Sequence, residues 1–158
     1  MNTGKLLAGL RICLGLIYLW AFFDKLFGLG LSTPRENAWI SGVSPTHGFL
    51  YFASRGPFAS ICKTIAGNGF VDWMFMLGLL LIGIALIFGI ARRVAGFSGA
   101  VMMAGMWLAV LPPKNHPFLC EQFVYMIIFL ILAGTAPVFS LSQKWSETWL
   151  VKKFPILE

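Results

Sequence analysis

Four long apolar runs constrain the fold of this chain more than any other feature. They cover residues 6–23, 73–91, 94–111 and 118–136. Each is about as long as the roughly 17 to 25 residues with which a helix crosses the hydrocarbon core of a bilayer. Because unpaired backbone groups are very costly in lipid, each run is expected to be helical. The sequence therefore predicts one all-α domain over residues 1–158, an integral membrane four-helix bundle.

The composition favours the bilayer as the solvent for these runs. Hydrophobic residues make up 58% of the chain and charged residues only 11%, whereas ordinary soluble domains carry about 25% charged residues. A short chain cannot bury this much apolar surface in one soluble core. The first run resembles a signal peptide, but no small-residue cleavage site follows it, so it is expected to remain as a membrane helix.

The distribution of Lys and Arg predicts the orientation. Seven of the 12 lie at the two termini and in the connection at Arg92 and Arg93, and five lie in the other connections. Short basic connections resist translocation, so both termini and this turn are expected in the cytoplasm of a multi-pass cell-membrane protein. Arg11, about one turn inside the first run, is expected to snorkel to the headgroups. The net charge of +6 forms no basic stripe, so no nucleic acid partner is expected.

The long connection over residues 28–69 is expected on the outer face. It contains too many aromatic and aliphatic residues to be disordered. Ser44 followed by Pro45, and Pro57 further on, are typical helix starts. They predict two short interfacial helices in this connection.

Most residues that could carry chemistry lie at the outer ends of the runs. Ionisable groups at the edge of a membrane bundle are functional candidates, although each one alone can simply face water or headgroups. The candidate catalytic residues are Asp24, Lys25, His47 and His116. The candidate binding residues are Trp20, Trp39, Trp107, Arg55 and Glu121. Asp72 belongs to the same outer group.

The sequence contains no motif that indicates metal binding or nucleotide binding. The two histidines lack ligand spacing, and there is no Cys-x-x-Cys or glycine-rich phosphate loop. Cys13 is expected to be a packing residue inside the first run. Cys62 and Cys120 both fall on the outer side, where a disulfide is chemically permitted. Whether they form a bridge or remain two thiols is left open by the sequence.

Several segments together resemble the DoxX/DoxD family of membrane proteins. They read RICLGLIYLWAFFDKL at residues 11–26, WISG at 39–42, SPTHGFL at 44–50 and FMLGL at 75–79, with Gly83 and Gly89 beyond. The stretch over residues 106–117 completes the pattern, and the resemblance covers residues 4–137. The segment KNHPFLCE at residues 114–121 departs from the Asn-Pro followed by acidic and His residues that the family pattern leads us to expect.

The resemblance implies a membrane subunit of the thiosulfate:quinone oxidoreductase type, which oxidises thiosulfate at the outer face and passes electrons to quinone. A quinone site needs an apolar slot with polar groups for its carbonyl oxygens, and Trp20, Trp107 and Phe49 are predicted to line it. The candidate catalytic residues would then handle protons and hydrogen bonds. Arg55 or Lys63 would attract the small anionic substrate. Because no side chain here carries electrons alone, electron transfer would require the quinone or a cofactor of a partner. A partner membrane subunit or a homo-oligomer is expected.

Two other interpretations stay open. The small-residue face formed by Gly96, Ala100 and Ala104, together with the lack of any cofactor motif, indicates a non-catalytic accessory subunit of a larger membrane complex. A small channel or transporter is less well supported, because no inverted internal repeat is visible.

Overall fold

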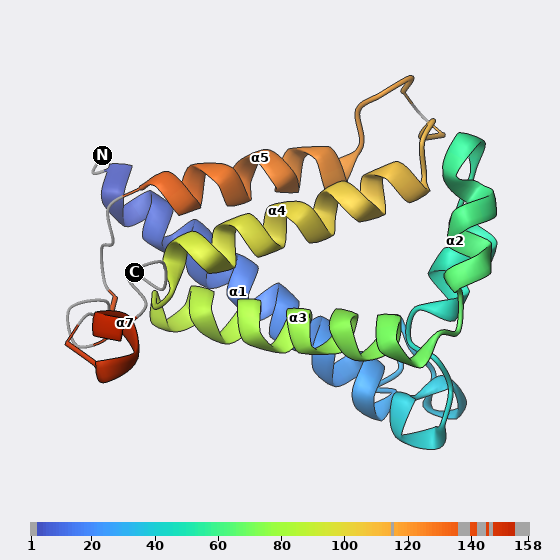
Figure 1. Ribbon diagram of the computed structural model, residues 1–158, viewed down its shortest axis with the longest axis horizontal. Helices are drawn as coiled ribbons and strands as arrows, with labels where there is room; N and C mark the ends of the chain where they lie inside the picture. The colour runs from blue at the N-terminus through green and yellow to red at the C-terminus, as the bar shows by residue number, and fades with distance from the viewer. Residues whose placement is uncertain (1–2, 115, 136–139, 142–144, 146, 154–158) are drawn as a thin grey trace.

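The computed structural model describes residues 3–114, 116–135, 140–141, 145 and 147–153. In this part of the chain all regular structure is helical, with no strand, which confirms the predicted all-α class. Four long helices carry the fold (Figure 1): α1 (Thr3–Phe27), α3 (Gly69–Phe88), α4 (Arg92–Ala109) and α5 (Glu121–Gly134). A short helix, α7 (Trp149–Lys153), lies at the same end of the bundle as the N-terminus (Figure 1).

The ends of the helices differ from the ends of the predicted apolar runs, because local capping residues determine where each helix starts and stops. The second run, predicted from residue 73, begins as α3 at Gly69, because the Asn68 side chain accepts a hydrogen bond from the N–H of Phe70 (2.9 Å). The same helix ends at Gly89, which is left-handed with a φ of 68°. The fourth run becomes helical only at Glu121, since Cys120 is extended. Its predicted last residue, 136, lies outside the described residues.

The helices pack as two pairs, α1 on α3 and α4 on α5, with α4 also against α3. Gly83 lies where α1 crosses α3, and a Cβ there would come within 2.9 Å of Leu19 Cγ. Gly96 makes the matching approach between α4 and α5, where a Cβ would lie 2.6 Å from that of Ala133. Small residues thus allow close helix approach. Gly96 and Ala100 of the predicted small-residue face are buried, whereas Ala104 is only half-buried.

A compact core joins the two pairs. Tyr18 of α1 meets Phe129 of α5 edge to face, with ring centroids 5.2 Å apart, and Phe129 and Met76 are fully buried. Leu79 and Ile82 of α3 complete the contact between the pairs. Two helices in the described part of the chain, α1 and α3, are long and apolar enough to cross a membrane, and α5 is a shorter apolar helix.

The prediction that Arg11 snorkels to the headgroups is wrong, because its side chain is buried. Only 5% of it is exposed, and its guanidinium lies so close to Gly89 that a Cβ at that glycine would collide with it. The C-terminal end of a helix carries partial negative charge, so the end of α3 favours a cation here. Nearby, Arg92 donates a hydrogen bond to the carbonyl of Thr135 and so links the start of α4 to the end of α5.

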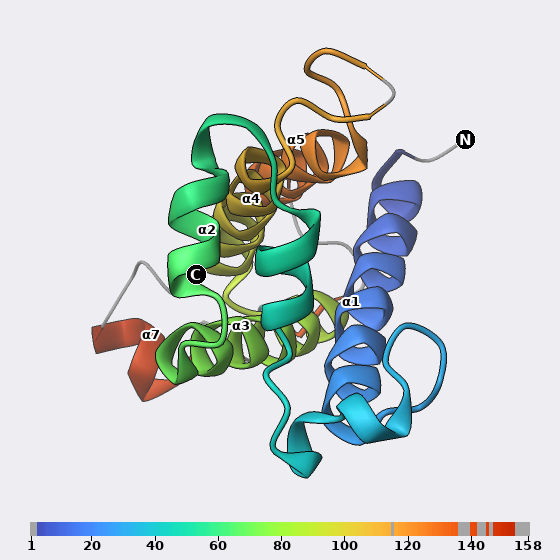
Figure 2. The same cartoon turned by 90° about the vertical axis from the view of Figure 1, so that its right-hand side faces the viewer.

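The connection between α1 and α3 consists of short helical segments. They are η1 (Arg35–Asn37), η2 (Trp39–Ser41), η3 (Phe49–Ala53), η4 (Gly56–Phe58) and α2 (Ala59–Ile65). In Figure 2 the teal segment that contains η3 lies between α1 and α2 at one end of the bundle. This end is opposite the one that holds the N-terminus and α7 (Figure 1).

Candidate functional site

The predicted catalytic residue Asp24 holds the chain as it leaves α1. Its side chain is fully buried. The carboxylate accepts hydrogen bonds from the Ser32 hydroxyl (2.6 Å), the Ser32 N–H (3.3 Å) and the Leu31 N–H (3.4 Å). Buried carboxylates need such donors. Asp24 is therefore occupied in fixing the turn after α1, while its neighbour Lys25 is half-buried.

A second buried carboxylate, Asp72, holds the middle of the same connection on the first turn of α3. One of its oxygens, Oδ1, accepts hydrogen bonds from the hydroxyls of Ser44 (2.8 Å) and Thr46 (2.5 Å). The Ser44 hydroxyl also accepts from the N–H of His47 (3.1 Å). We call Asp72, Ser44 and Thr46 the Asp72 clamp. The sequence placed Asp72 among the outer ionisable residues but did not predict these partners, which lie 26 and 28 residues away.

The two histidines belong to different segments. The His47 ring stacks on Tyr51, with centroids 5.3 Å apart, and Lys63 lies 5.8 Å from the centre of the same Tyr51 ring. His116 is exposed, and its Nδ1 accepts from the N–H groups of Phe118 (3.2 Å) and Leu119 (2.9 Å). His116 thus shapes the turn before α5. Within the described residues, no group of three or more His, Cys, Asp and Glu side chains could hold a metal ion.

The three tryptophans predicted to bind a cofactor lie in separate environments. Trp39 packs edge to face on Trp73, with centroids 4.7 Å apart. Trp107 donates from Nε1 to the carbonyl of Phe118 (2.7 Å) and so belongs to the connection between α4 and α5. Trp20 projects from α1 with 51% of its surface exposed. The quinone slot formed by Trp20, Trp107 and Phe49 stays a prediction.

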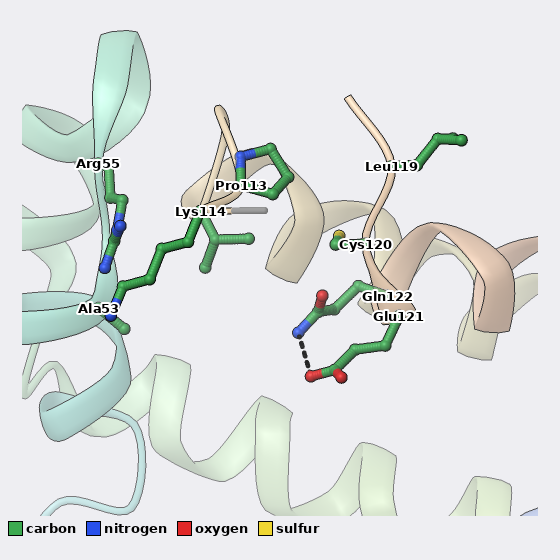
Figure 3. Close-up of a pocket in the computed structure, with 9 residues that line it drawn as sticks. Ala53, Arg55, Pro113, Lys114, Leu119, Cys120, Glu121 and Gln122 are labelled. Atoms are coloured by element: carbon green, nitrogen blue, oxygen red, sulfur yellow. Dashed lines mark hydrogen bonds between the residues drawn. The ribbon is translucent and has the colours of Figure 1, made fainter. Parts of the chain in front are cut away.

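A pocket of about 410 Å³ opens where α4 ends and α5 begins (Figure 3). We call it the α4–α5 pocket. Its polar lining residues are Arg55, Lys114, Cys120, Glu121 and Gln122. Its apolar lining residues are Ala53, Val110, Pro113 and Leu119. Two predicted binding residues, Arg55 and Glu121, are therefore brought together in one site.

Backbone contacts hold Arg55 at this pocket. Its N–H donates to the carbonyl of Ala109 at the end of α4 (2.8 Å). The preceding residue, Ser54, is buried, and its hydroxyl donates to the carbonyl of Leu50 (2.6 Å). The following residue, Gly56, has a φ of 61° and lies against the carbonyl of Leu111, where a Cβ would collide. The first connection is thus fixed to the end of α4.

The charges of the pocket are only partly balanced. The side chains of Arg55 and Lys114 extend toward the same side, whereas Glu121 and Gln122 approach from α5 (Figure 3). The Glu121 carboxylate accepts a hydrogen bond from Gln122 Nε2 (3.4 Å). No ion pair among the described residues joins Glu121 to either cation. Two uncompensated cations in a concave site attract anions, and arginine binds oxyanions with two parallel N–H groups.

The cysteines are all free thiols. Cys62 is buried in α2, whereas Cys120 is half-buried and lines the α4–α5 pocket. The possible Cys62–Cys120 bridge is therefore not formed. The prediction that Cys13 is a packing residue is wrong, because its side chain is exposed on the surface of α1.

Comparison of the chain with protein-family models, with curated proteins and with solved structures finds no match. The site is therefore interpreted from its own chemistry. Sequence reasoning missed Lys114, Cys120 and Gln122 as neighbours of Arg55, since about 60 residues separate the two parts of the pocket. The available signal was the density of polar side chains in the KNHPFLCEQ segment between two apolar runs.

Proposed function

We propose that this chain is the anion-binding membrane subunit of a quinone-linked oxidoreductase. Its substrate is a small oxyanion of the thiosulfate type, which is taken up at the outer face. The observation that carries the proposal is the α4–α5 pocket, in which Arg55 and Lys114 have no balancing ion pair among the described residues. The resemblance of the sequence to the DoxX/DoxD family supports the link to quinone.

The exposed surface of the long helices supports the membrane environment. In the most apolar window of α1 and of α3, only 33% of the residues are buried. The core helix of a soluble protein would be mostly buried. Large apolar side chains such as Leu16 on α1 and Leu81 on α3 are instead more than half exposed. Apolar surface on this scale requires a covering, and we assign that covering to lipid around all four long helices.

The orientation proposed from the charges places the pocket outside. The turn at Arg92 and Arg93 and the two termini are assigned to the cytoplasm. The pocket lies at the other ends of α4 and α5, next to α2 and the connection that follows α1 (Figures 1 and 3). A substrate that stays outside the cell therefore reaches it without crossing the bilayer.

The chain's own role in this function is to bind and orient the anion. Arg55 offers a planar fork of N–H donors, and Lys114 offers a compact charge. Together they can neutralise a dianion next to the Cys120 thiol and the apolar wall formed by Val110 and Leu119. Trp39 packs on Trp73 and Trp107 donates to the carbonyl of Phe118, so we assign the quinone site to a partner membrane subunit or a second copy.

Binding of thiosulfate to the purified chain in nanodiscs, followed by isothermal titration calorimetry, tests the anion site. The Arg55→Gln/Lys114→Gln double variant should weaken binding more than tenfold, because both charges that face the anion are lost. Lys63→Gln is the matched control. It removes one positive charge from the same connection, but Lys63 contacts Tyr51 and does not line the pocket. Equal losses in both variants would show only general charge attraction and would contradict the proposed site.

One observation favours the accessory-subunit interpretation as a second candidate. The buried carboxylates Asp24 and Asp72 are occupied by hydrogen bonds that hold the connection, and neither lines the pocket. If this candidate is correct, changes at Arg55 and Lys114 should leave electron transfer by the whole complex unchanged. Changes at Asp24 and Asp72 should instead reduce the amount of complex that assembles.

A further inference from the structure

The Asp72 clamp and the α4–α5 pocket share one short stretch of chain, residues 46–55. Thr46 belongs to the clamp at one end of this stretch, and Arg55 lines the pocket at the other end. Between them lies η3 (Phe49–Ala53), and the stretch reaches the pocket on the side opposite α5 (Figure 3). We call residues 46–55 the linking segment. Its position decides whether Arg55 faces the pocket.

A continuous series of hydrogen bonds runs along the linking segment from the clamp. The Thr46 hydroxyl donates to Oδ1 of Asp72 (2.5 Å), and the Thr46 carbonyl accepts from the N–H of Leu50 (2.9 Å). The Leu50 carbonyl then accepts from the Ser54 hydroxyl (2.6 Å). Thr46 is 6% exposed and Ser54 is 8% exposed. Because buried hydroxyls are costly to leave without a partner, these bonds are expected to form and break together.

The far end of the linking segment is fixed to the end of α4. The N–H of Arg55 donates to the carbonyl of Ala109 (2.8 Å). Gly56, the next residue, has a φ of 61° and lies so close to the Leu111 carbonyl that a Cβ would collide with it. Both contacts exist only while the segment lies against α4. Opening of the segment therefore takes Arg55 away from the pocket.

We propose that Asp72 and Thr46 are positioning residues for the anion site, because they hold the linking segment that carries Arg55. This inference rests on the anion binding stated in the proposed function. With the segment closed, Arg55 and Lys114 both face the bound anion, whereas with the segment open only Lys114 remains. An anion thus binds the closed form more tightly. Since linkage is reciprocal, a bound anion must in turn stabilise the closed segment against opening.

Amide hydrogen exchange with and without thiosulfate tests this coupling in the full chain in nanodiscs. The reporters are the N–H groups of His47 and Leu50, whose hydrogen bonds lie within the clamp and along the linking segment. Neither residue lines the pocket, so the anion cannot protect them by direct contact. At about 100 times the Kd that calorimetry gives for thiosulfate, their exchange should slow about 10- to 100-fold. The N–H groups of Leu31 and Ser32, held by Asp24, should keep their rates.

Thr46→Val tests transmission along the segment, because it removes one hydroxyl and leaves Asp72 and both cations in place. The reporters should exchange about tenfold faster without thiosulfate, and the N–H of Arg55 should accelerate by the same factor. Thr46→Ser, which keeps the hydroxyl, should restore the original rates. Ser32→Ala is the matched control, since it removes a hydroxyl that donates to the other buried carboxylate, Asp24 (2.6 Å). It should leave the reporters and the N–H of Arg55 unchanged.

Thiosulfate that binds without slowing the reporters, or that slows Leu31 and Ser32 equally, would overturn the inference. An unchanged Arg55 amide in Thr46→Val would also overturn it. The proposed function would survive these results if Arg55→Gln/Lys114→Gln still weakened thiosulfate binding. It fails separately if thiosulfate slows the reporters but the complete complex shows no thiosulfate-dependent quinone reduction. Absence of any thiosulfate binding to the unmodified chain would reject both.

Discussion

Removing the Asp72 carboxylate should release the connection between α1 and α3 without unfolding the helices. Asp72 is 5% exposed, and its Oδ1 is the acceptor for the hydroxyls of Ser44 and Thr46 at 2.8 and 2.5 Å. Thr46 is itself 6% exposed, so in Asp72→Ala its hydroxyl is left buried without this acceptor. The perturbation therefore acts on the segment that leads into η3 and Arg55.

The size of the effect follows from the two hydrogen bonds. A hydrogen bond to a charged group contributes about 1.5 to 3 kcal/mol. Loss of both in Asp72→Ala should lower the free energy of local opening by about 3 kcal/mol or more. Because each 1.4 kcal/mol is a factor of ten, the open population should rise about 150-fold. Asp72→Asn keeps an acceptor oxygen and loses only the charge, so its open population should rise about tenfold.

Amide hydrogen exchange measures this opening in the protein held in detergent or nanodiscs. The amides of residues 46–53 should exchange faster by these factors. The amides of Leu31 and Ser32, which the separate Asp24 carboxylate holds, provide a control within the same experiment. Unchanged exchange over residues 46–53 in Asp72→Ala, or equal acceleration in both segments, would refute the clamp as the local anchor.

Three further predictions concern packing, cysteine chemistry and orientation. Gly96→Ala should destabilise the protein by about 1–3 kcal/mol, because the added Cβ would meet Ala133 and the backbone of Phe129. Gly105→Ala on the same helix has open space around its Cβ and should stabilise the protein by up to about 1 kcal/mol. Thermal unfolding in which both variants lower the melting temperature equally would contradict this. Titration of the denatured, unreduced chain with a maleimide should find three thiols, and a count of one would indicate a disulfide. In sealed cells, an impermeant thiol reagent should modify Cys120 and leave a cysteine placed at position 93 untouched, and the reverse pattern would invert the orientation.

The sequence was sufficient for the helices, because each long apolar run can form only a helix if it is to satisfy its own backbone. The boundaries moved where a single side chain decides them, as Asn68 does for α3. The connection over residues 28–69 was harder to predict. Its segments are held by partners distant in the sequence, and hydropathy alone does not show that Thr46 and Asp72 share a hydrogen bond.

Only part of the candidate site could be predicted, because its residues also come from distant parts of the sequence. Arg55 and Glu121 were recognised by type and position, and the structure brings them into one pocket. Asp24 was named as a candidate catalytic residue because it is an ionisable group at the predicted edge of the membrane. Its burial beneath Ser32 depends on the turn after α1, which the sequence does not specify. Arg11 was misjudged because Gly89, 78 residues away, provides the space in which it is buried.

Quinone reduction by the complex purified from its native membrane tests the central claim most directly. With thiosulfate added on the outer side of sealed vesicles, we predict quinone reduction that depends on thiosulfate. The rate at limiting thiosulfate should fall more than tenfold in Arg55→Gln/Lys114→Gln and remain unchanged in Lys63→Gln. Reduction that proceeds at the full rate in the double variant, or a complete complex that reduces no quinone with thiosulfate, would contradict the role of the α4–α5 pocket in a quinone-linked oxidoreductase.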